Sequence, residues 1–537
     1  MLHFSIKVFL SLILTCNLVI AQVPQFTWMS GSDTAYSIGV YGTKGVPSVN
    51  NIPSPRWNSV SWSTNNTLWL LGGYFGNYDY TNDLWKYTIS TNEWTWVSGS
   101  NTYNQPSNYG TKGVSSPGNV PSARYSSATW TDNLGNLWLF GGWGYAAGNY
   151  GYLNDLWKYN TATNEWTWIS GSNYANQSGN YGTKGQYYIA NMPGARSNAV
   201  TWIDNNILWL FGGSGLAGSS GNTSNLNDVW QYNITTDQWI WMSGSSVGNQ
   251  SGTFGTQGQA SINNIPPARY DGNGWKDSNN DVWIFGGISS ALGWLNDLWK
   301  YDSTTGEWTW ISGSNVSNQF PVYGVKGTPD AANTPGARNG SSSWIDNNGL
   351  WLFGGRGTGG TSNGTLNDLW KYNTGTNEWT WIAGSNTLNP LSVYGTKGVS
   401  SANTIPAGRY NSSYWKDNNN NFWIFGGMAH FSFYYDATAN DLWKIDAATL
   451  IGINELDQKA NSHVSVLPNP SNGEFTITAK QDQALAVINE LGIITNNVVL
   501  NTSNNYTTQL KINTPGIYYL MSNNNSYPVK EKIIVIK

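Results

Sequence analysis

Six short stretches, which we expect to be loops, each follow a Gly-Gly pair and differ from one another in sequence, and the first, second and sixth are rich in aromatic side chains. An aromatic ring offers a large contact area and a π face for sugar C–H groups, so such stretches are natural ligand platforms. The other interpretation is that the rings pack against neighbouring segments as small satellite cores. The candidate ligand-binding residues are Tyr74, Phe75, Tyr78, Asp79, Tyr80, Trp143, Tyr145, Trp294, Arg356, His430, Phe431, Tyr434 and Tyr435.

Groups suited to catalysis are scarce. Beyond residue 21 the only histidines are His430 and His463, and the only cysteine of the chain is Cys16. Zinc sites built from His and Cys are therefore not expected. Acid/base hydrolysis or lyase chemistry needs only two carboxylates. Asp79, Asp330 and Asp436 could supply them and form a site with His430, but the spacing of these residues does not require such a site. We predict no catalytic residue, no metal and no cofactor, with a polysaccharide-active enzyme as an alternative.

These stretches belong to a unit of about 70 residues that occurs six times. Its signatures are an arginine, a tryptophan, a segment of the type LWLFGG, the motif NDLW and the motif EWTW. Six copies in one order predict a repeat architecture. The repeated arginines are Arg56, Arg124, Arg196, Arg269, Arg338 and Arg409.

Each unit has four short runs rich in Trp, Tyr, Ile and Thr, bounded by Gly, Asn, Asp and Ser, which is typical of half-buried strands. Packing such four-stranded sheets radially buries both faces of each sheet, which predicts an all-β, six-bladed propeller. The sixth unit stops after Trp443 without an EWTW strand, and the chain has a spare copy at 26–28. We therefore expect the N-terminal strand to complete the last blade and close the ring.

The strand ending in Gly-Gly, the aromatic about a dozen residues later and the Trp beyond it resemble the kelch repeat of galactose-oxidase-like propellers. Each unit departs from the common kelch pattern by a further stretch of about 25 residues containing YGTKG or a variant, which we expect to form a structural collar on one face. Galactose oxidase holds copper with two His, two Tyr and a Cys crosslink, so the resemblance does not extend to that chemistry. A sialidase-like site would need several single-copy arginines, and only Arg356 is available.

Several polar residues recur sixfold and are expected to serve the blade. The aspartate of NDLW should cap a turn or pair with the repeated arginine; the alternative, a ring of arginines holding an anion, would leave charge unpaired. The DNN-type turns at Asp204, Asp346 and Asp417 could indicate calcium, but Asn and Asp favour hairpin turns. The repeated aspartates are Asp83, Asp155, Asp228, Asp297, Asp368 and Asp441, and the collar lysines are Lys44, Lys112, Lys184, Lys326 and Lys397.

The two ends of the chain predict its destination. Residues 1–21 fit a signal peptide, with a weaker lipoprotein interpretation at Cys16. The propeller is expected at 22–449, a linker at 450–463 and a small β-sandwich at 464–537. The phrases PNPSNGEFTI, PGIYYL and the basic last residues of this sandwich resemble the C-terminal sorting domain of the type IX secretion system of Bacteroidetes. The resemblance implies delivery to the cell surface or the medium, though an ordinary accessory β-sandwich would share the strand pattern.

The balance of charged residues argues against one class of partner. Lys and Arg total 26 against 30 for Asp and Glu, with no basic stripe, so nucleic acid is not an expected partner. No second apolar run is long enough to span a bilayer. The sequence predicts a non-catalytic module that binds glycans or surface proteins and engages the type IX machinery through its C-terminal part, with a structural adhesion or matrix protein as a further alternative.

Overall fold

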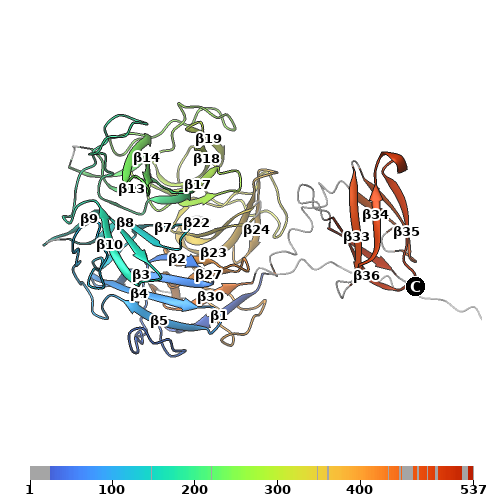
Figure 1. Cartoon of the computed structure of the whole chain (residues 1–537), viewed down its shortest axis with the longest axis horizontal. Helices are drawn as coiled ribbons and strands as arrows, with labels where there is room; N and C mark the ends of the chain where they lie inside the picture. The colour runs from blue at the N-terminus through green and yellow to red at the C-terminus, as the bar shows by residue number, and fades with distance from the viewer. Residues whose placement is uncertain are drawn as a thin grey trace, which may run out of the picture. The chain divides into compact units, whose positions relative to one another are not determined.

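The computed structural model describes residues 24–146, 148–218, 221–346, 349–359, 362–432, 435–446, 449, 464–468, 471–479, 482–489, 494–522 and 530–535. The chain forms two compact units, Met1–Thr449 and Leu450–Lys537. Every element named in the described residues is a strand except one short 3-10 turn, η1 (Thr502–Asn504). No helix among these residues is long and apolar enough to cross a membrane. Figure 1 shows both units, each treated separately below.

The first unit consists of six antiparallel blades arranged around an axis (Figure 1). Blade one holds β2 (Val60–Thr64), β3 (Thr67–Gly76), β4 (Asp79–Thr88) and β5 (Glu93–Ser98). Blade two holds β6 (Arg124–Tyr125), β7 (Ala128–Thr131), β8 (Leu137–Tyr145), β9 (Tyr150–Asn160) and β10 (Glu165–Ser170). Blade three holds β11 (Arg196–Ser197), β12 (Val200–Asp204), β13 (Ile207–Leu216), β14 (Thr223–Asn233) and β15 (Gln238–Ser243).

The remaining blades repeat this order. Blade four holds β16 (Asn273–Lys276), β17 (Val282–Ser289), β18 (Gly293–Asp302) and β19 (Glu307–Ser312). Blade five holds β20 (Arg338–Asn339), β21 (Ser342–Ile345), β22 (Gly349–Gly359), β23 (Ser362–Asn373) and β24 (Glu378–Ala383). Blade six holds β25 (Arg409–Tyr410), β26 (Ser413–Lys416), β27 (Phe422–Phe425), β28 (Met428–Ser432), β29 (Tyr435–Thr438), β30 (Leu442–Ile445) and β1 (Phe26–Ser30).

The N-terminal strand completes blade six, as the sequence predicted. β1 pairs antiparallel with β30, with Phe26 opposite Ile445 and Trp28 opposite Trp443. The innermost strand of each blade contacts that of the next, and β26 of blade six contacts β2 of blade one. Phe26 and Trp28 are buried. The first and last segments of the propeller are therefore held in one sheet.

A second set of bonds joins the blades at the axis. In each blade the second residue after the repeated arginine has a positive φ, and its N–H donates to the same residue of the neighbouring blade over 2.7–3.1 Å. Asn58 donates to Asn411, and Ser126 donates to Asn58, so the chain of bonds runs round all six blades and returns to its start. We call these the ring residues: Asn58, Ser126, Asn198, Asp271, Gly340 and Asn411.

The core lies between blades rather than within them. Trp85 and Trp94 of blade one pack with Trp423 and Phe425 of blade six in one buried cluster, and the other interfaces repeat this arrangement. Both faces of each sheet are thus removed from water, which is where the apolar burial that stabilises the fold arises.

The Gly-Gly pair interrupts the second strand without ending it. In blade one the register shifts between Leu71 and Gly73, a β-bulge, and the strand continues to Gly76 before a tight turn. Gly72 has φ 63°, and a Cβ there would lie 2.5 Å from the Arg124 carbonyl oxygen of the next blade, so only glycine fits. The prediction that the segments after Gly-Gly are loops is therefore wrong in most blades, where they are hairpins that extend β3, β8, β13, β17 and β22.

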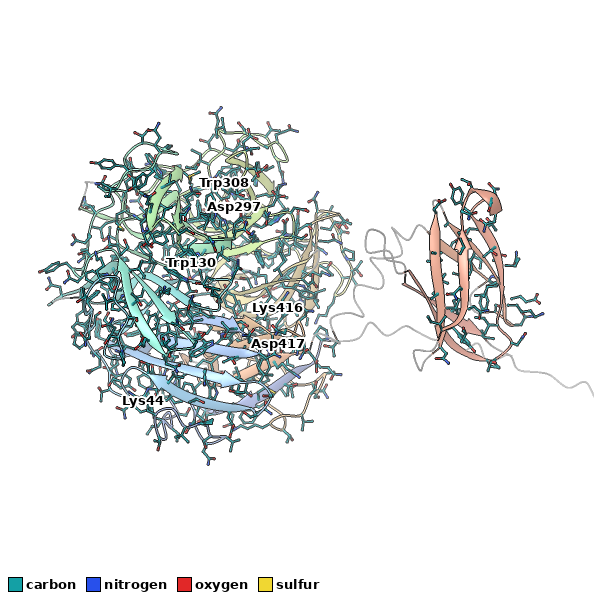
Figure 2. All side chains as sticks on the ribbon, in the orientation of Figure 1. Lys44, Trp130, Asp297, Trp308, Lys416 and Asp417 are labelled. Atoms are coloured by element: carbon teal, nitrogen blue, oxygen red, sulfur yellow. The ribbon has the colours of Figure 1, made fainter. Side chains whose placement is uncertain are left out.

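The repeated arginines pair with the repeated aspartates, as predicted. Each of the six pairs closes at 2.6–2.8 Å with both side chains buried. In blade one Arg56 also donates to the carbonyl oxygens of Ser54 and Gly72, while Trp85 donates to Asp83. Burial alone would raise the pKa of Asp83, but the Arg56 charge together with the hydrogen bonds from Arg56, Tyr41 and Trp85 lowers that pKa below its ordinary value. The alternative of an arginine ring that holds an anion is therefore excluded. Figure 2 labels Asp297, the partner of Arg269, inside blade four.

The YGTKG segments tie the collar to the same pairs. Tyr41 donates a hydrogen bond of 2.7 Å to Asp83, and Tyr109, Tyr181, Tyr323 and Tyr394 do the same in their blades. Blade four has Phe254 at this position. The collar lysines lie 4.2–4.8 Å from the ring centroid of a tryptophan, with Lys44 over Trp96 as one case. Figure 2 labels Lys44.

The DNN-type segments lie in hairpin turns between first and second strands. The Asp417 carboxylate accepts hydrogen bonds from the backbone N–H groups of Asn419 and Asn421 and from Trp423 Nε1. Asp204 ends β12, and the backbone N–H of Asp346 donates to Gly349 across its turn. The interpretation of these aspartates as turn residues is confirmed.

The second unit contains two antiparallel sheets that share one core. One sheet holds β31 (Val464–Leu467), β32 (Glu474–Ala479) and β35 (Thr507–Lys511). The other holds β33 (Gln483–Asn489), β34 (Ile494–Leu500), β36 (Gly516–Ser522) and β37 (Lys530–Val535). Phe475, Ile477, Val487, Leu520 and Ile533 lie in their common core. The described residues thus form a small β-sandwich, as expected.

Candidate ligand-binding site

One face of the propeller carries both the hairpins after Gly-Gly and the long segments between blades. The N–H of Asn104, in the segment after blade one, donates to the Tyr80 carbonyl of the blade-one hairpin over 2.8 Å. The N–H of Asn176 donates in the same way to Tyr152 of blade two over 2.7 Å. The segments after blades three, four and five make the same contact, so these long segments pack on the hairpins of their own blades.

The residue that follows each repeated arginine lies between this hairpin and the axis. Arg124 pairs with Gly144, and Tyr125 pairs with Trp143, so the arginine strand runs beside the hairpin. The next residue along is a ring residue that lines the axial cavity. We use the term mouth residues for the six residues that each lie between a repeated arginine and a ring residue in the sequence: Trp57, Tyr125, Ser197, Tyr270, Asn339 and Tyr410.

Aromatic rings from three blades form one continuous arc at this mouth. Trp57 lies 6.1 Å from Tyr410 of blade six, 5.4 Å from Tyr74 and 6.3 Å from Tyr125 of blade two, measured between ring centroids. Tyr80 stacks on Tyr125 at 5.5 Å. Burial raises the pKa of Tyr125 and of Tyr410, so both hydroxyls remain hydrogen-bond donors at neutral pH. We call these five residues the aromatic arc.

The predicted site residues of blade one divide between this arc and its surroundings. Tyr74 is half-buried within the arc, while Tyr80 is only 6% exposed and forms its base. Phe75 contacts Tyr36 and Tyr103 of the long segments, so for this ring the satellite-core interpretation holds. Tyr78 is 77% exposed at the hairpin tip. Asp79 accepts a hydrogen bond from Asn104 Nδ2 (3.3 Å).

Blades two and four place their candidates differently. Trp143 contacts Tyr152, and Tyr145 contacts Tyr150, which in turn contacts Tyr80. These rings extend the arc outward over blade two. Trp294 is half-buried in β18, where its backbone N–H donates to Asn318, and no ring contact joins it to another aromatic side chain of the described residues. Trp294 is thus not part of the arc.

Polar candidates gather where blades five and six meet. Arg356 is exposed, and its guanidinium carbon lies 5.8 Å from the ring centroid of Tyr410. His430 is 6% exposed and its Nδ1 lies 2.8 Å from Asp436 Oδ1. These side chains border the blade-six end of the aromatic arc.

The remaining candidates do not join this group. Phe431 packs against Ala407, Ala429 and Ala439. Phe433 and Tyr434, and the side chain of Tyr435, lie outside the described residues. Asp330 lies in the long segment before blade five, and its backbone pairs with that of Trp379 in β24. Of the four groups considered for acid/base chemistry, only His430 and Asp436 are therefore in contact. The possible site that also included Asp79 and Asp330 is not formed.

An axial cavity of about 240 Å³ opens beside the mouth residues. All six blades line it, through the ring residues and the first strands, and Asp271 is its only charged lining residue. Asn339 Nδ2 donates to Asp271 Oδ2 over 2.6 Å. The Asn411 side-chain amide is best oriented with its nitrogen toward Asp271 and its oxygen toward Asn58. In this orientation the nitrogen donates to both oxygens of the Asp271 carboxylate, at 3.0 and 3.2 Å. Burial raises the pKa of Asp271 to about 6.

Comparison with known proteins agrees with this architecture. The family model for the KLHDC2/KLHL20/DRC7 Kelch-repeats domain matches residues 255–392, and that for the secretion system C-terminal sorting domain matches residues 465–537. Kelch domain-containing protein 10 of Bos taurus and of Homo sapiens are each 26% identical over 271 residues, or 49% of this chain and 49% of theirs. The chain thus aligns with about half the length of these relatives.

The chain carries kelch repeats and a C-terminal sorting domain. The sixfold residues of its kelch propeller, the Arg–Asp pairs and the collar tyrosines, belong to the scaffold. Residues of blades one, two, five and six that are not repeated sixfold meet at one mouth, where rings, a guanidinium and a carboxylate could contact a ligand.

Sequence reasoning missed the mouth residues and Asp271. Trp57 has no equivalent tryptophan in the other repeats, and this is the signal that could have found it. Tyr125, Tyr270 and Tyr410 went unnoticed because they follow an arginine that is repeated for structural reasons. Comparison of the kelch units position by position would have found them, since the two positions after the arginine vary while the arginine does not.

The raised pKa of Asp271 predicts an unusual pH dependence. The pKa is higher in the folded protein than its ordinary value of 3.8, so the folded state gains stability from protonation below pH 4 and loses it as the pH rises through about 6. Asp271→Asn should therefore leave the free energy of unfolding unchanged at pH 4 and raise it by about 2 kcal/mol at pH 8 in low-salt buffer. Urea unfolding at both pH values measures this. Equal stabilities at pH 8 would contradict the prediction.

Proposed function

We propose that this protein is a secreted or cell-surface binding module that holds its partner at the aromatic arc. The observation that carries the proposal is the continuity of the arc: rings from blades six, one and two touch at the mouth of a rigid propeller, and four of the five are half-buried rather than fully buried. Partly exposed aromatic rings on a fixed scaffold contribute much of the binding energy in protein interfaces. The kelch repeats favour a surface protein as the partner; glycan is the other partner that such rings could stack on.

The C-terminal sorting domain supports the extracellular setting. Such a domain implies export through a secretion system to the cell surface or medium. The signal peptide at 1–21, the propeller limits at 22–449 and the linker at 450–463 remain part of the proposal. The type IX machinery would then be a second partner, engaged by residues 464–537 rather than by the propeller.

Binding of the full chain to a glycan panel, and its capture of proteins from the producing cell surface, tests the proposal. Trp57→Ala and Tyr410→Ala should each weaken binding by about 1–3 kcal/mol, or roughly 5- to 150-fold, because Trp57 lies at the centre of the arc and Tyr410 forms its blade-six end. Tyr174→Ala is the matched control, since this exposed tyrosine lies in a long segment between blades and stacks on no other ring of the described residues. Equal losses in all three variants, or none, would contradict a site at the arc.

A second candidate function rests on the contact between His430 and Asp436. A histidine oriented by a carboxylate can act as a general base, so polysaccharide hydrolysis or elimination is the alternative. Shortening of a polymer in the same panel, abolished by His430→Gln, would support it. Self-association of the chain without any bound partner would instead favour a structural role.

A further inference from the structure

Asp271 is half-buried, and unlike the buried acids of the propeller it has, among the described residues, neither a cation nor a full set of hydrogen-bond donors beside its carboxylate. Each repeated aspartate of the NDLW motif faces a buried arginine. Asp132 has no such partner, but four donors reach its carboxylate: the N–H groups of Leu134 and Asn136, Asn136 Nδ2 and Trp138 Nε1. Asp271 receives only the amide groups of Asn339 and Asn411.

No basic side chain lines the axial cavity on the side of Asp271. Lys276 and Lys416 line the opposite end of the axis, where they donate to the carbonyl oxygens of Ile203 and Ile345. Arg356, the one arginine outside the six buried pairs, lies over Tyr410. A carboxylate in a low-dielectric interior without a counter-charge is unfavourable, and the raised pKa of Asp271 expresses this.

The rest of the cavity lining is rich in neutral oxygen atoms. Serine, threonine and asparagine supply most of it, including the ring residues Asn58, Ser126 and Asn198. Ser126 Oγ and Asn273 Oδ1 belong to lining residues that are at least nine-tenths buried, and both oxygens lack a hydrogen-bond partner. Because these two oxygens are closed to solvent, the oxygens that can reach an ion in the cavity are those of the other lining residues.

We propose that the axial cavity binds a monovalent cation against the Asp271 carboxylate, with neutral oxygens of the ring residues completing its shell. One carboxylate matches a single positive charge, whereas tight calcium sites recruit several carboxylates. The cavity of about 240 Å³ greatly exceeds the ~30 Å³ of one water molecule, so the ion can retain part of its hydration. The bound cation would supply the charge that the arginines supply to the buried aspartates, and it would join blades at the axis.

Thermal unfolding of the full chain in sodium, potassium or N-methylglucamine acetate, at pH 8 and equal ionic strength, tests this site. We expect the melting temperature to be about 2 °C or more higher with sodium or potassium than with the bulky organic cation, because the ion binds only the folded state. Asp271→Asn should abolish the difference. This variant is compatible with folding, since Asn58, Asn198 and Asn411 occupy the same ring position with φ values of 53–54°.

Asp33→Asn is the matched control, because it removes the same charge from an exposed acid and should leave the cation effect intact. Crystals soaked in thallium(I) acetate should show an anomalous peak beside Asp271 that is missing in Asp271→Asn. Equal melting temperatures in all three salts, an equal cation effect in Asp271→Asn, or a thallium peak only elsewhere would each overturn the proposal.

Discussion

Asp228→Asn should lower the free energy of unfolding by about 3–5 kcal/mol, among the largest losses expected from a single substitution in this propeller. Asp228 and Arg196 are both buried, and the carboxylate accepts two hydrogen bonds from the guanidinium at 2.7 and 2.8 Å. The amide would leave the Arg196 charge without a counter-charge inside blade three. Trp230 Nε1 and Tyr181 Oη, which also donate to Asp228, would lose an ionised acceptor.

Denaturant unfolding followed by tryptophan fluorescence measures this loss. Tyr181→Phe is the matched control: it removes one donor from the same carboxylate but keeps the ion pair, and blade four already has Phe254 at this position. We expect it to cost about 1 kcal/mol. Equal losses in the two variants would mean that the ion pair contributes no more than one hydrogen bond, contrary to this account.

Deleting residues 22–32 should produce a loss of about 6–10 kcal/mol, because it removes the strand that completes blade six. Phe26 and Trp28 are buried, and truncation of such side chains costs about 3–5 kcal/mol each. The deletion also exposes β30 as an unpaired sheet edge, which favours aggregation. Calorimetry and light scattering of the full chain with and without these residues measure both effects.

The double variant Phe26→Ala and Trp28→Ala separates packing from strand pairing, since it keeps the backbone that pairs with β30. It should melt between the wild type and the deletion. A deletion variant that melts at the wild-type temperature would show that β1 does not hold the ring closed.

Most of the propeller could be predicted because it is repeated. The spacing of Gly-Gly, NDLW and EWTW motifs gave the strands, and the missing last strand of the sixth unit gave the closure by β1. The sequence left two roles for the repeated aspartates, a turn cap or a partner for the arginine, and the cost of buried charge argued only against a ring of unpaired arginines. The extent of the hairpins was not predicted, since a Gly-Gly bulge and a strand end have the same local sequence signal.

The sequence by itself determined the blade and its scaffold, because each blade depends on local strand patterns and on contacts repeated six times. Only the tertiary structure decided the mouth. Trp57 and Tyr410 are 353 residues apart in the chain and touch because the ring closes, and the surroundings of Asp271 come from Asn339 and Asn411 of two other blades. The residues that surround the mouth and Asp271 come from different blades. The sequence of one repeat therefore does not show which side chains meet there.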